Sequence, residues 1–228
     1  MIHLKKIIPK GIKKFIKNFL FRKAPKKKGF HGSKLYWEER YVSNRNSGPG
    51  SYGRLAEFKA EILNSFVAKN NIQTIIEYGC GDGNQLSLSV YPNYLGYDIS
   101  KKAVAICIEK FAGDETKKFE VISTNTVYKN AEVALSLDVI FHLVEDSVFN
   151  EYMLRLFNTA TEYVIIYSSN YEASIAAHVR CRKFTDWIST HVSDNWSLHQ
   201  KIDNPYPMHE DDPDNTSFAD FYIYKKNQ

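Results

Sequence analysis

Three glycines on alternate residues, Gly79, Gly81 and Gly83, follow an acidic residue at Glu77. Glycine has no Cβ, so such a run permits a tight turn and lets a flat polar ligand lie against the backbone. The dinucleotide fingerprint Gly-x-Gly-x-x-Gly needs its third glycine where this chain has Asn84, which weakens a nicotinamide dinucleotide interpretation. A phosphate-binding loop is excluded because no Gly-Lys-Ser/Thr follows. The cluster predicts a ligand site of another kind.

A second acidic residue, Asp98, stands fifteen residues after Gly83 and is followed by Ile99. If Asp98 ends the next strand, it lies beside the glycine turn, because ligands of open α/β sheets bind at the carboxyl ends of the strands. Its carboxylate could accept hydrogen bonds from both ribose hydroxyls of an adenosine, and Ile99 could cover one face of the adenine. The two features together predict an adenosine-type cofactor, whereas the glycine turn alone is also common as an ordinary strand-to-helix turn.

Asp138 and His142 lie four residues apart, just after a predicted strand. If this segment is helical, both side chains point to one reacting centre. Histidine titrates near neutrality and suits the removal of a proton from an acceptor hydroxyl. The alternatives are structural: His142 as a packing residue between Phe141 and Leu143, and Asp138 as the N-cap of the following turn.

Cations gather in a third segment, which contains His178, Arg180, Arg182 and Lys183. We expect a helix over residues 178–188, in a part of the fold that often covers the acceptor. Guanidinium groups bind phosphate and carboxylate in a bidentate manner, so His178, Arg180 and Arg182 are candidates for holding an anionic acceptor. A helix with cations on a solvated face would have the same sequence.

Alternating periodicities place these residues in one architecture. The expected strands are residues 74–78, 94–97, 118–122, 132–137, 163–167, 196–202 and 217–224. The expected helices are residues 55–67, one after Gly83, one from an N-cap at Ser100 to about Gly113, and one capped by Asp146. This alternation predicts an α/β fold with a doubly wound, mostly parallel seven-stranded sheet of Rossmann-like type, closed by an antiparallel C-terminal hairpin.

The first 30 residues differ from the rest in charge. They hold eleven Lys and Arg and no acid, which leaves nineteen basic and twenty-six acidic residues in the remainder. Apolar residues recur at helical spacing from Ile8 to Phe19, which predicts a basic amphipathic helix and linker at residues 1–30, before one domain at residues 31–228. Such a helix favours reversible docking of residues 1–28 on an anionic membrane, although a solvated extension or a helix packed on its own domain is also compatible. The acidic body is not expected to bind nucleic acid.

Composition excludes several other classes of protein. No apolar run approaches the roughly 18 residues that a membrane-spanning helix needs, and lysines interrupt every stretch that could be a secretory signal. Cys80, Cys107 and Cys181 are widely spaced, which fits neither a disulfide framework nor a zinc site and is typical of a reducing cytoplasm. No cluster of carboxylates and histidines indicates a metal. We expect a cytoplasmic protein without a metal, in peripheral contact with the inner membrane surface through its basic segment.

Longer motifs add a resemblance to a known family. Together with the glycine cluster and Asp98, they resemble class I methyltransferases that use S-adenosylmethionine, in particular a bacterial subgroup often encoded among genes for capsule and other surface glycans. The motifs are residues 36–41 (YWEERY), 47–59 (SGPGSYGRLAEFK), 135–143 (LSLDVIFHL), 163–170 (YVIIYSSN) and 217–221 (SFADF). The resemblance covers residues 33–228 and is specific for the cofactor rather than for the acceptor. Two positions depart from the pattern: Asn44-Arg45-Asn46 replaces a common Gly-Gly step, and Cys181 stands where similar sequences often have His.

The resemblance implies roles for residues at several strand ends and in the segment before the first strand. The implied contacts are Glu77, Gly79 and Gly81 to the methionine moiety, Asp98 and Ile99 to ribose and adenine, Thr124 or Asn125 to the adenine amino edge, and Ser136 and Leu137 beside the sulfonium. Arg54 is the implied cation for the cofactor's carboxylate, with a surface arginine at a helix start as the alternative. Tyr36 belongs to a lid over the cofactor, or packs the first helix on the sheet.

The function implied by the resemblance is methyl transfer from S-adenosylmethionine to a small-molecule acceptor. We expect an anionic glycan precursor, such as a sugar phosphate or a nucleotide-sugar, methylated at oxygen by in-line displacement. Methylation at nitrogen of an amino sugar or phosphoramidate group stays open, as does a non-catalytic cofactor-binding module in a glycan assembly complex. A nucleotide-dependent dehydrogenase is a third alternative.

Overall fold

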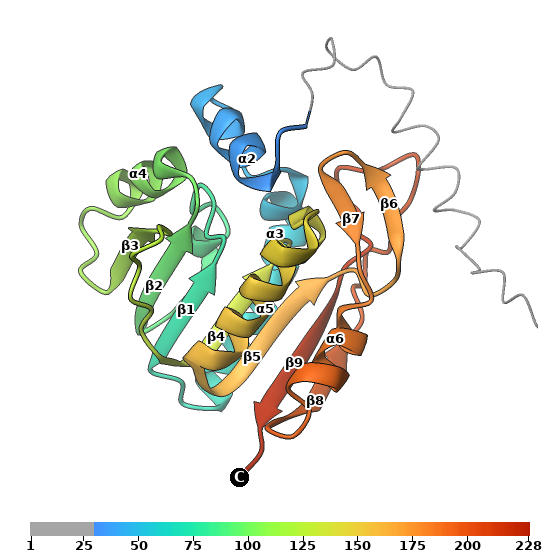
Figure 1. Cartoon of the computed structure of the whole chain (residues 1–228). Helices are drawn as coiled ribbons and strands as arrows, with labels where there is room; N and C mark the ends of the chain where they lie inside the picture. Colours follow the sequence, from blue (N-terminus) through green and yellow to red (C-terminus); the bar gives the residue numbers. More distant parts are fainter. Residues whose placement is uncertain (1–29) are drawn as a thin grey trace, which may run out of the picture.

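The structure is a computed structural model that describes residues 30–228 (Figure 1). Residues 1–29, where the basic helix is predicted, lie outside the described part. Seven strands form the main sheet: β1 (Thr74–Tyr78), β2 (Asn93–Asp98), β3 (Lys117–Val121), β4 (Ala131–Leu137), β5 (Ala160–Ser168), β8 (Trp196–Ile202) and β9 (Asp220–Lys226). The α-helices are α2 (Ser33–Val42), α3 (Gly53–Lys69), α4 (Lys101–Lys110), α5 (Asp146–Thr159) and α6 (Phe184–His191).

The strand order in the sheet is β3-β2-β1-β4-β5-β9-β8. Strands β1 to β5 pair in parallel, whereas β9 pairs antiparallel with both β5 and β8. The doubly wound, mostly parallel sheet and its antiparallel C-terminal hairpin are therefore confirmed. The order reverses between β1 and β4, and open α/β sheets bind ligands outside the carboxyl ends of the strands at such a point.

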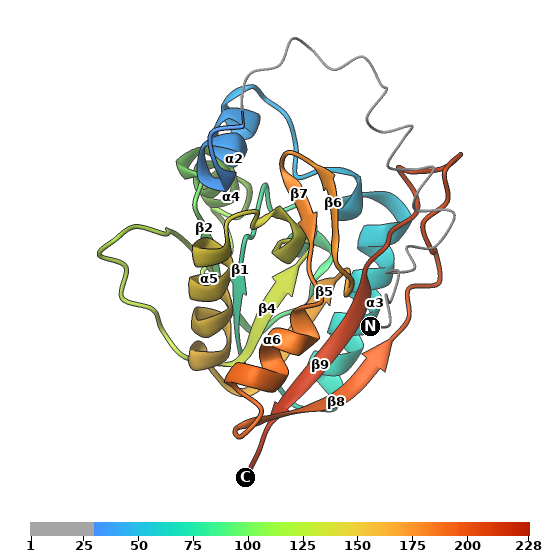
Figure 2. The ribbon, with the colours of Figure 1, turned by 45° about the vertical axis from the view of Figure 1, so that its right-hand side comes forward.

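Side chains alternate between the two faces of the sheet, as the period of two in a strand requires. Ile75 of β1 packs in the cluster that contains Leu63 of α3. Its neighbour Ile76 packs in the cluster that contains Met153 of α5. Helices therefore cover both faces, and α2 stands apart above the carboxyl ends of β1 and β2 (Figures 1 and 2).

Some of the sequence signals for the start of a helix are confirmed by the structure and others are not. Ser100 caps α4 as predicted, because its hydroxyl oxygen accepts a hydrogen bond from the Ala103 amide at 3.2 Å. The predicted cap at Asp146 is one residue off, since Glu145 is the N-cap of α5. A helix predicted after Gly83 is wrong: the structure has only a 3₁₀ turn at Leu86–Leu88 (η2).

Sequence around η2 explains that error. The Ser87 hydroxyl donates to the main-chain oxygen of Asn84 at 2.6 Å, a local bond that competes with helical backbone bonding. Gly83 has a φ of +69°, which is outside the helical region. Pro92 then limits the segment to a few residues before β2, so no full helix fits.

A hairpin replaces the first part of the helix that the sequence predicts over residues 178–188, whereas the second part is confirmed as α6. The hairpin consists of β6 (Ala173–Ala176) and β7 (Val179–Cys181), and α6 begins only after it. Val179 and Cys181 are buried while Arg180 is only half-buried, a period of two that belongs to a strand. The buried pair packs against Phe141 in a small separate cluster, so tertiary contacts decide the local structure here.

Candidate active site

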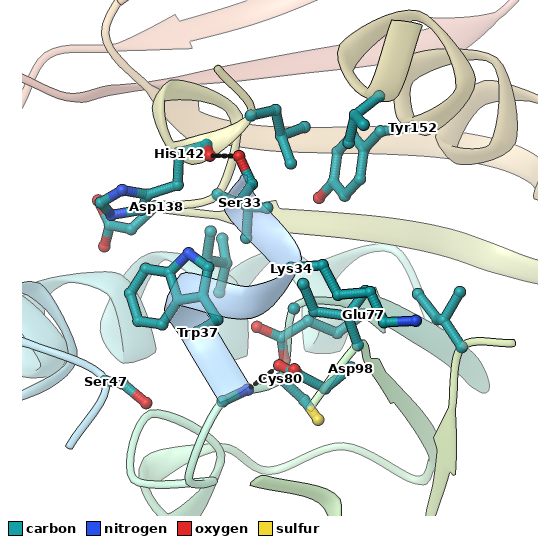
Figure 3. A pocket seen from close by; sticks show the side chains of 18 of the residues that line it. Ser33, Lys34, Trp37, Ser47, Glu77, Cys80, Asp98, Asp138, His142 and Tyr152 are labelled. Carbon is teal, nitrogen blue, oxygen red and sulfur yellow. Dashed lines mark hydrogen bonds between the residues drawn. The ribbon is translucent and has the colours of Figure 1, made fainter. Parts of the chain in front are cut away.

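A cavity of about 500 Å³ lies at the carboxyl ends of β1, β2 and β4, beneath α2 (Figure 3). Its size is typical of small-molecule sites, which span roughly 300–1,000 Å³. Eight of the predicted cofactor-binding and catalytic residues line it: Glu77, Gly79, Gly81, Asp98, Ile99, Leu137, Asp138 and His142. The sheet therefore brings most of the predicted site together.

The glycine loop after β1 forms one wall of this cavity. Gly79 and Gly81 have φ of +88° and +59°, in the left-handed region that favours glycine. A Cβ on Gly79 would lie 2.6 Å from a methyl carbon of Val139, and one on Gly81 would lie 2.9 Å from the Tyr41 hydroxyl oxygen. No larger residue fits at either position without movement of these neighbours, so the loop keeps a bare backbone against the cavity.

The Asp98 carboxylate fixes this loop from the end of β2. Its Oδ2 accepts a hydrogen bond from the Gly81 amide at 3.0 Å, and its Oδ1 accepts one from the Ser100 amide at 2.8 Å. Burial raises the pKa of Asp98 to about 6, against the opposing effect of these backbone donors. A buried carboxylate with remaining lone pairs facing a cavity is suited to accept hydroxyl donors from a ligand.

Two further acceptors line the cavity near the glycine loop. Glu77 is buried, and its Oε2 accepts a hydrogen bond from the Tyr94 hydroxyl at 2.6 Å. Burial raises the pKa of Glu77 to about 7. Gln85 donates from Nε2 to the Ala56 main-chain oxygen at 3.0 Å, while its Oε1 is buried without a hydrogen-bond partner among residues 30–228. An unpartnered buried acceptor is costly, which favours a ligand that donates to it.

Lys59 is a buried cation in the same cavity, and sequence reasoning missed it. Its side chain is 1% exposed, and Nζ lies 2.6 Å from Oδ2 of Asp138. Asp138 has a φ of +59°, a strained conformation for a residue other than glycine. The sequence carries a signal for this residue, because Lys59 sits at helical spacing between the buried Leu55 and Leu63, on the apolar face of α3.

His142 lies on the 3₁₀ turn Ile140–His142 (η3) rather than on an α-helix. Its Nδ1 is 3.1 Å from the His178 main-chain oxygen. Because a carbonyl oxygen only accepts, this contact places the proton on Nδ1 and leaves the lone pair on Nε2. Burial lowers the pKa of His142 to about 3, so the imidazole is neutral at physiological pH.

Helix α2 covers the cavity through its inner face. Ser33, at its start, donates from its amide to Glu145 Oε1 at 2.9 Å and from its hydroxyl to the His142 main-chain oxygen at 2.7 Å. Figure 3 shows the second of these bonds, with Trp37 beside His142. The Trp37 ring meets the His142 imidazole edge-on at a centroid distance of 4.7 Å. Helix α2 therefore covers the imidazole of His142.

The cation cluster predicted to hold an anionic acceptor has other partners. Arg182 is buried, and its guanidinium lies 2.6 Å from Asp146 Oδ1 and donates to the main-chain oxygens of Leu143 and Val144. Arg180 lies 3.0 Å from the same carboxylate oxygen. Neither arginine lines the cavity. The two cations tie the β6–β7 hairpin to the start of α5, which sequence spacing could not reveal.

Five other predicted residues also lie outside the cavity lining, namely Arg54, Tyr36, Asn125, Ser136 and His178. Arg54 pairs with Asp212 at 3.2 Å on the surface. Tyr36 stacks on His178 at 4.3 Å and thereby joins α2 to the hairpin. Ser136 is buried 2.7 Å from the Tyr152 hydroxyl, behind the wall. Asn125 is exposed, whereas its neighbours Thr124 and Thr126 line the cavity.

Within residues 30–228, no helix has the length and apolar character needed to cross a bilayer. The same part of the chain contains no group of three His, Cys, Asp or Glu side chains arranged to hold a metal ion.

No family model and no curated protein matches this sequence. Solved structures do resemble the fold. The N-methyltransferase NodS from Bradyrhizobium japonicum WM9, in complex with S-adenosyl-l-homocysteine, is similar with a TM-score of 0.67 at 9% identity, over 86% of this chain and 100% of that one. This chain has the Rossmann-like methyltransferase fold.

Two further structures support the methyltransferase fold. Magnesium protoporphyrin IX methyltransferase (ChlM) from Synechocystis PCC 6803 with bound SAM has a TM-score of 0.64 at 14% identity, over 88% of this chain and 100% of that chain. The methyltransferase domain of bacterial CtHen1-CN has a TM-score of 0.53 at 19% identity, over 73% of this chain and 97% of that chain. At these identities the likeness is one of fold.

Proposed function

We propose that this chain is a methyltransferase that binds S-adenosylmethionine in the cavity beneath α2. The observation that carries the proposal is the bare glycine loop at the point where the strand order of the sheet reverses. Asp98 holds this loop, because its carboxylate accepts a hydrogen bond from the Gly81 amide. The polar groups on the wall of the cavity fit such a ligand. Its nucleoside part needs close backbone approach and an acceptor for two hydroxyls, and this wall supplies both.

The other end of the cavity fits the amino-acid part of the same molecule. That part carries an ammonium and a carboxylate. Glu77 and the unpartnered Oε1 of Gln85 are acceptors for the ammonium, and Lys59 is a buried cation for the carboxylate. Ile99 covers the adenine, as the resemblance implies, and Leu137 lies at the end of β4. Opposite charges are thus available at the positions where a zwitterion needs them.

S-adenosylmethionine supplies an electrophilic methyl group on a positively charged sulfur, which keeps the electron pair of the broken carbon–sulfur bond. The chain has to position the acceptor, exclude water and take up a proton. His142 is neutral and has its lone pair on Nε2, so it can accept a hydrogen bond from an acceptor hydroxyl. Burial makes it a weak base, and it takes the proton only as the new carbon–oxygen bond forms and makes that hydroxyl strongly acidic. Asp138, anchored by Lys59, positions the segment that carries His142.

The acceptor we propose is a small anionic glycan precursor methylated at oxygen, on the strength of the resemblance to a glycan-associated subgroup. Methylation at nitrogen is a second candidate, because NodS is an N-methyltransferase with this fold. A neutral imidazole serves either reaction. Since Arg180 and Arg182 are paired with Asp146, cations on the cavity itself, Lys34 and Arg155, are the better candidates for an anionic group.

Two measurements test the proposal. Titration calorimetry with S-adenosylhomocysteine should show one site per chain, with an affinity that is strongly weakened in Asp98→Asn and retained in His142→Ala. Incubation with methyl-labelled S-adenosylmethionine and a panel of sugar phosphates, nucleotide-sugars and amino sugars should give a product heavier by one methyl group. His142→Ala should lower its yield about 100-fold or more. Binding without turnover on any extract would favour a non-catalytic module, and absence of binding would reject the proposal.

A further inference from the structure

The turn of the β6–β7 hairpin lies beside α2, at the His142 end of the cavity. Tyr36 of α2 stacks on His178 of this turn at a centroid distance of 4.3 Å, and the His178 imidazole lies nearly parallel to that of His142 at 6.0 Å. Trp37, the next residue of α2, lies 4.7 Å from the His142 ring. Four rings therefore gather at the end of the cavity where an acceptor has to meet the proposed base.

Arg40 lies on the same helix, and its guanidinium is fixed along one edge. Nε donates to the Asn46 main-chain oxygen at 2.6 Å, and the guanidinium carbon lies 5.5 Å from the centroid of the Trp37 ring. Among residues 30–228, the two terminal nitrogens of Arg40 donate no hydrogen bond. One of them lies above the bare backbone of Gly48, where a Cβ would lie 3.7 Å from it. This guanidinium is held in place with its terminal N–H groups available, the arrangement that binds an oxyanion in a bidentate manner.

Arg45 adds a second guanidinium just after the end of α2. Its amide donates to the Arg40 main-chain oxygen at 3.1 Å, and its side chain is exposed. Neither arginine forms an ion pair with a carboxylate in the described part of the chain, and residues 1–29 contain no Asp or Glu. Burial lowers the pKa of His178, and the positive charges of Arg40 and Arg45 lower it further. Both cations thus face this imidazole without a carboxylate to balance them.

We infer that Arg40 and Arg45 form a binding site for a phosphate group of the acceptor, at the entrance to the His142 end of the cavity. Guanidinium groups bind phosphate oxygens through charge-assisted hydrogen bonds in a planar fork that matches the anion. Lys34 and Arg155 line the cavity itself, whereas this pair stands at its edge and is joined to the proposed base through the Trp37 ring. The role of the acceptor rests on the proposed function, but phosphate binding at the two arginines does not.

Trp37 links the phosphate site to the base, because its ring contacts both the Arg40 guanidinium and the His142 imidazole. An acceptor with its phosphate on Arg40 would lay a ring-sized group against this indole and bring a hydroxyl to Nε2 of His142. Sugar phosphates and nucleotide-sugars have this shape. Burial and, to a lesser extent, the charge of Arg40 lower the pKa of His142. A bound phosphate would offset that charge, so the acceptor itself would make the imidazole a stronger base.

The first test measures phosphate binding to the full chain by NMR of the histidine side chains, with inorganic phosphate added at constant ionic strength. The His178 resonances should move and give a Kd. Arg40→Gln should raise this Kd about tenfold and Arg45→Gln about threefold, because each removes charge-assisted hydrogen bonds. Arg180→Gln is the matched control, since it removes a half-buried arginine from the same hairpin that is already paired with Asp146, and it should change the Kd by less than about twofold.

The phosphate site would be overturned by three results: no movement of the His178 resonances, a Kd unchanged in both Arg40→Gln and Arg45→Gln, or an equal rise in Arg180→Gln. Arg45 is exposed, so Arg45→Gln should keep the unfolding midpoint of the unmodified chain. This variant therefore decides the question even where Arg40→Gln is less stable.

A second test concerns the acceptor and uses glucose 1-phosphate in the presence of S-adenosylhomocysteine. Its sugar should reach past Trp37, so it should move the His142 resonances further than the same concentration of inorganic phosphate does. Equal movement with both probes would overturn the assignment of the site to the acceptor. Calorimetry with S-adenosylhomocysteine on the same sample separates the two proposals, because failure of that binding rejects the proposed function and leaves the Kd for inorganic phosphate valid.

Discussion

The two sides of the cavity are built in different ways. The side that contains the glycine loop comes from one stretch of chain, from Glu77 at the end of β1 to Asp98 at the end of β2. The side that contains His142 combines distant parts: Ser33 bonds to Glu145, 112 residues away, and Arg182 bonds to Asp146, 36 residues away. One side is thus determined by local sequence and the other by tertiary contacts.

The two sides of the cavity also differ in how their charged side chains are paired. On the glycine-loop side, burial raises the pKa of two acids, to about 6 for Asp98 and to about 7 for Glu77, although the charge of Lys59 opposes the shift of Glu77. On the other side, charges are already paired inside the protein, as Lys59 with Asp138 and Arg182 with Asp146. Raised pKa values mark the acids of a binding surface, whereas the pair of Arg182 with Asp146 only ties parts of the chain together and marks a scaffold. Lys59 belongs to both, because it anchors Asp138 and also lines the cavity.

The largest expected effect is on the glycine-loop side. In Asp98→Asn, one side-chain oxygen must serve where two now accept from Gly81 and Ser100, and an amide NH₂ faces one of these donors. The loop loses an anchor and the ligand loses a charged acceptor. We expect the Kd for S-adenosylhomocysteine to rise about 100-fold, measured by calorimetry. Asp194→Asn, at an exposed turn, is the matched control, and equal affinities in both variants would contradict the assignment.

The second prediction compares two cations. Lys59→Met leaves Asp138 without its partner at 2.6 Å, which should lower the free energy of unfolding by about 3 kcal/mol and weaken S-adenosylhomocysteine binding about 30-fold. Arg54→Ala removes a surface pair whose side chains are 39% and 44% exposed, so it should cost under about 0.5 kcal/mol and leave the Kd within twofold.

Urea denaturation and calorimetry on both variants measure these differences. Asp138→Asn added to Lys59→Met should recover part of the lost stability, because it removes the unpaired charge. A larger loss of affinity in Arg54→Ala than in Lys59→Met would show that Arg54, the cation expected from the sequence, reaches the carboxylate after all.

The same contrast explains how far the sequence could predict the molecule. Strand β1 is predicted to the residue and α4 with its cap, since a β-branched run before glycines and a serine before a helix are local signals. The start of the hairpin β6–β7 is mispredicted as helix, because the packing of Val179 and Cys181 on Phe141 is a tertiary contact that the sequence does not show. The roles of Arg180 and Arg182 are hidden for the same reason. Only their contacts with Asp146 and Val144 show what they do.

For the site, the sequence correctly predicted the residues whose positions are determined by the backbone. Gly79, Gly81 and Asp98 line the cavity, because a turn and a strand end fix their places. It failed for Arg54, whose long side chain turns to Asp212, and it overlooked Lys59. A flexible side chain reaches several partners from one backbone position, so spacing alone does not choose among them. A lysine on the apolar face of α3 was the available clue.

The third prediction separates the two arginines on the scaffold side. Arg182→Ala removes a guanidinium whose side chain is 7% exposed. It leaves the Leu143 main-chain oxygen without this donor, and Asp146 and the Val144 main-chain oxygen with Arg180 alone, so the free energy of unfolding should fall by about 2 kcal/mol. Arg180→Ala removes a pair that solvent already screens and should cost less than about 1 kcal/mol. Urea denaturation decides, and S-adenosylhomocysteine affinity should change little in either variant. Equal stability of the two would show that burial does not distinguish them.

The smallest expected effect is a pH dependence on the binding side. Glu77 has a pKa raised by burial to about 7, so it becomes neutral as the pH falls through that value and no longer attracts an ammonium. The Kd for S-adenosylhomocysteine should rise up to about tenfold from pH 8 to pH 6. The free chain should show the opposite trend, because a carboxyl that binds its proton more tightly when folded makes stability fall as the pH rises from about 4.5 to 7. Glu77→Gln should flatten both curves. If the binding curve of this variant still changes in the same window, the titrating group is another one, and Asp98, with a pKa of about 6, is the next to examine.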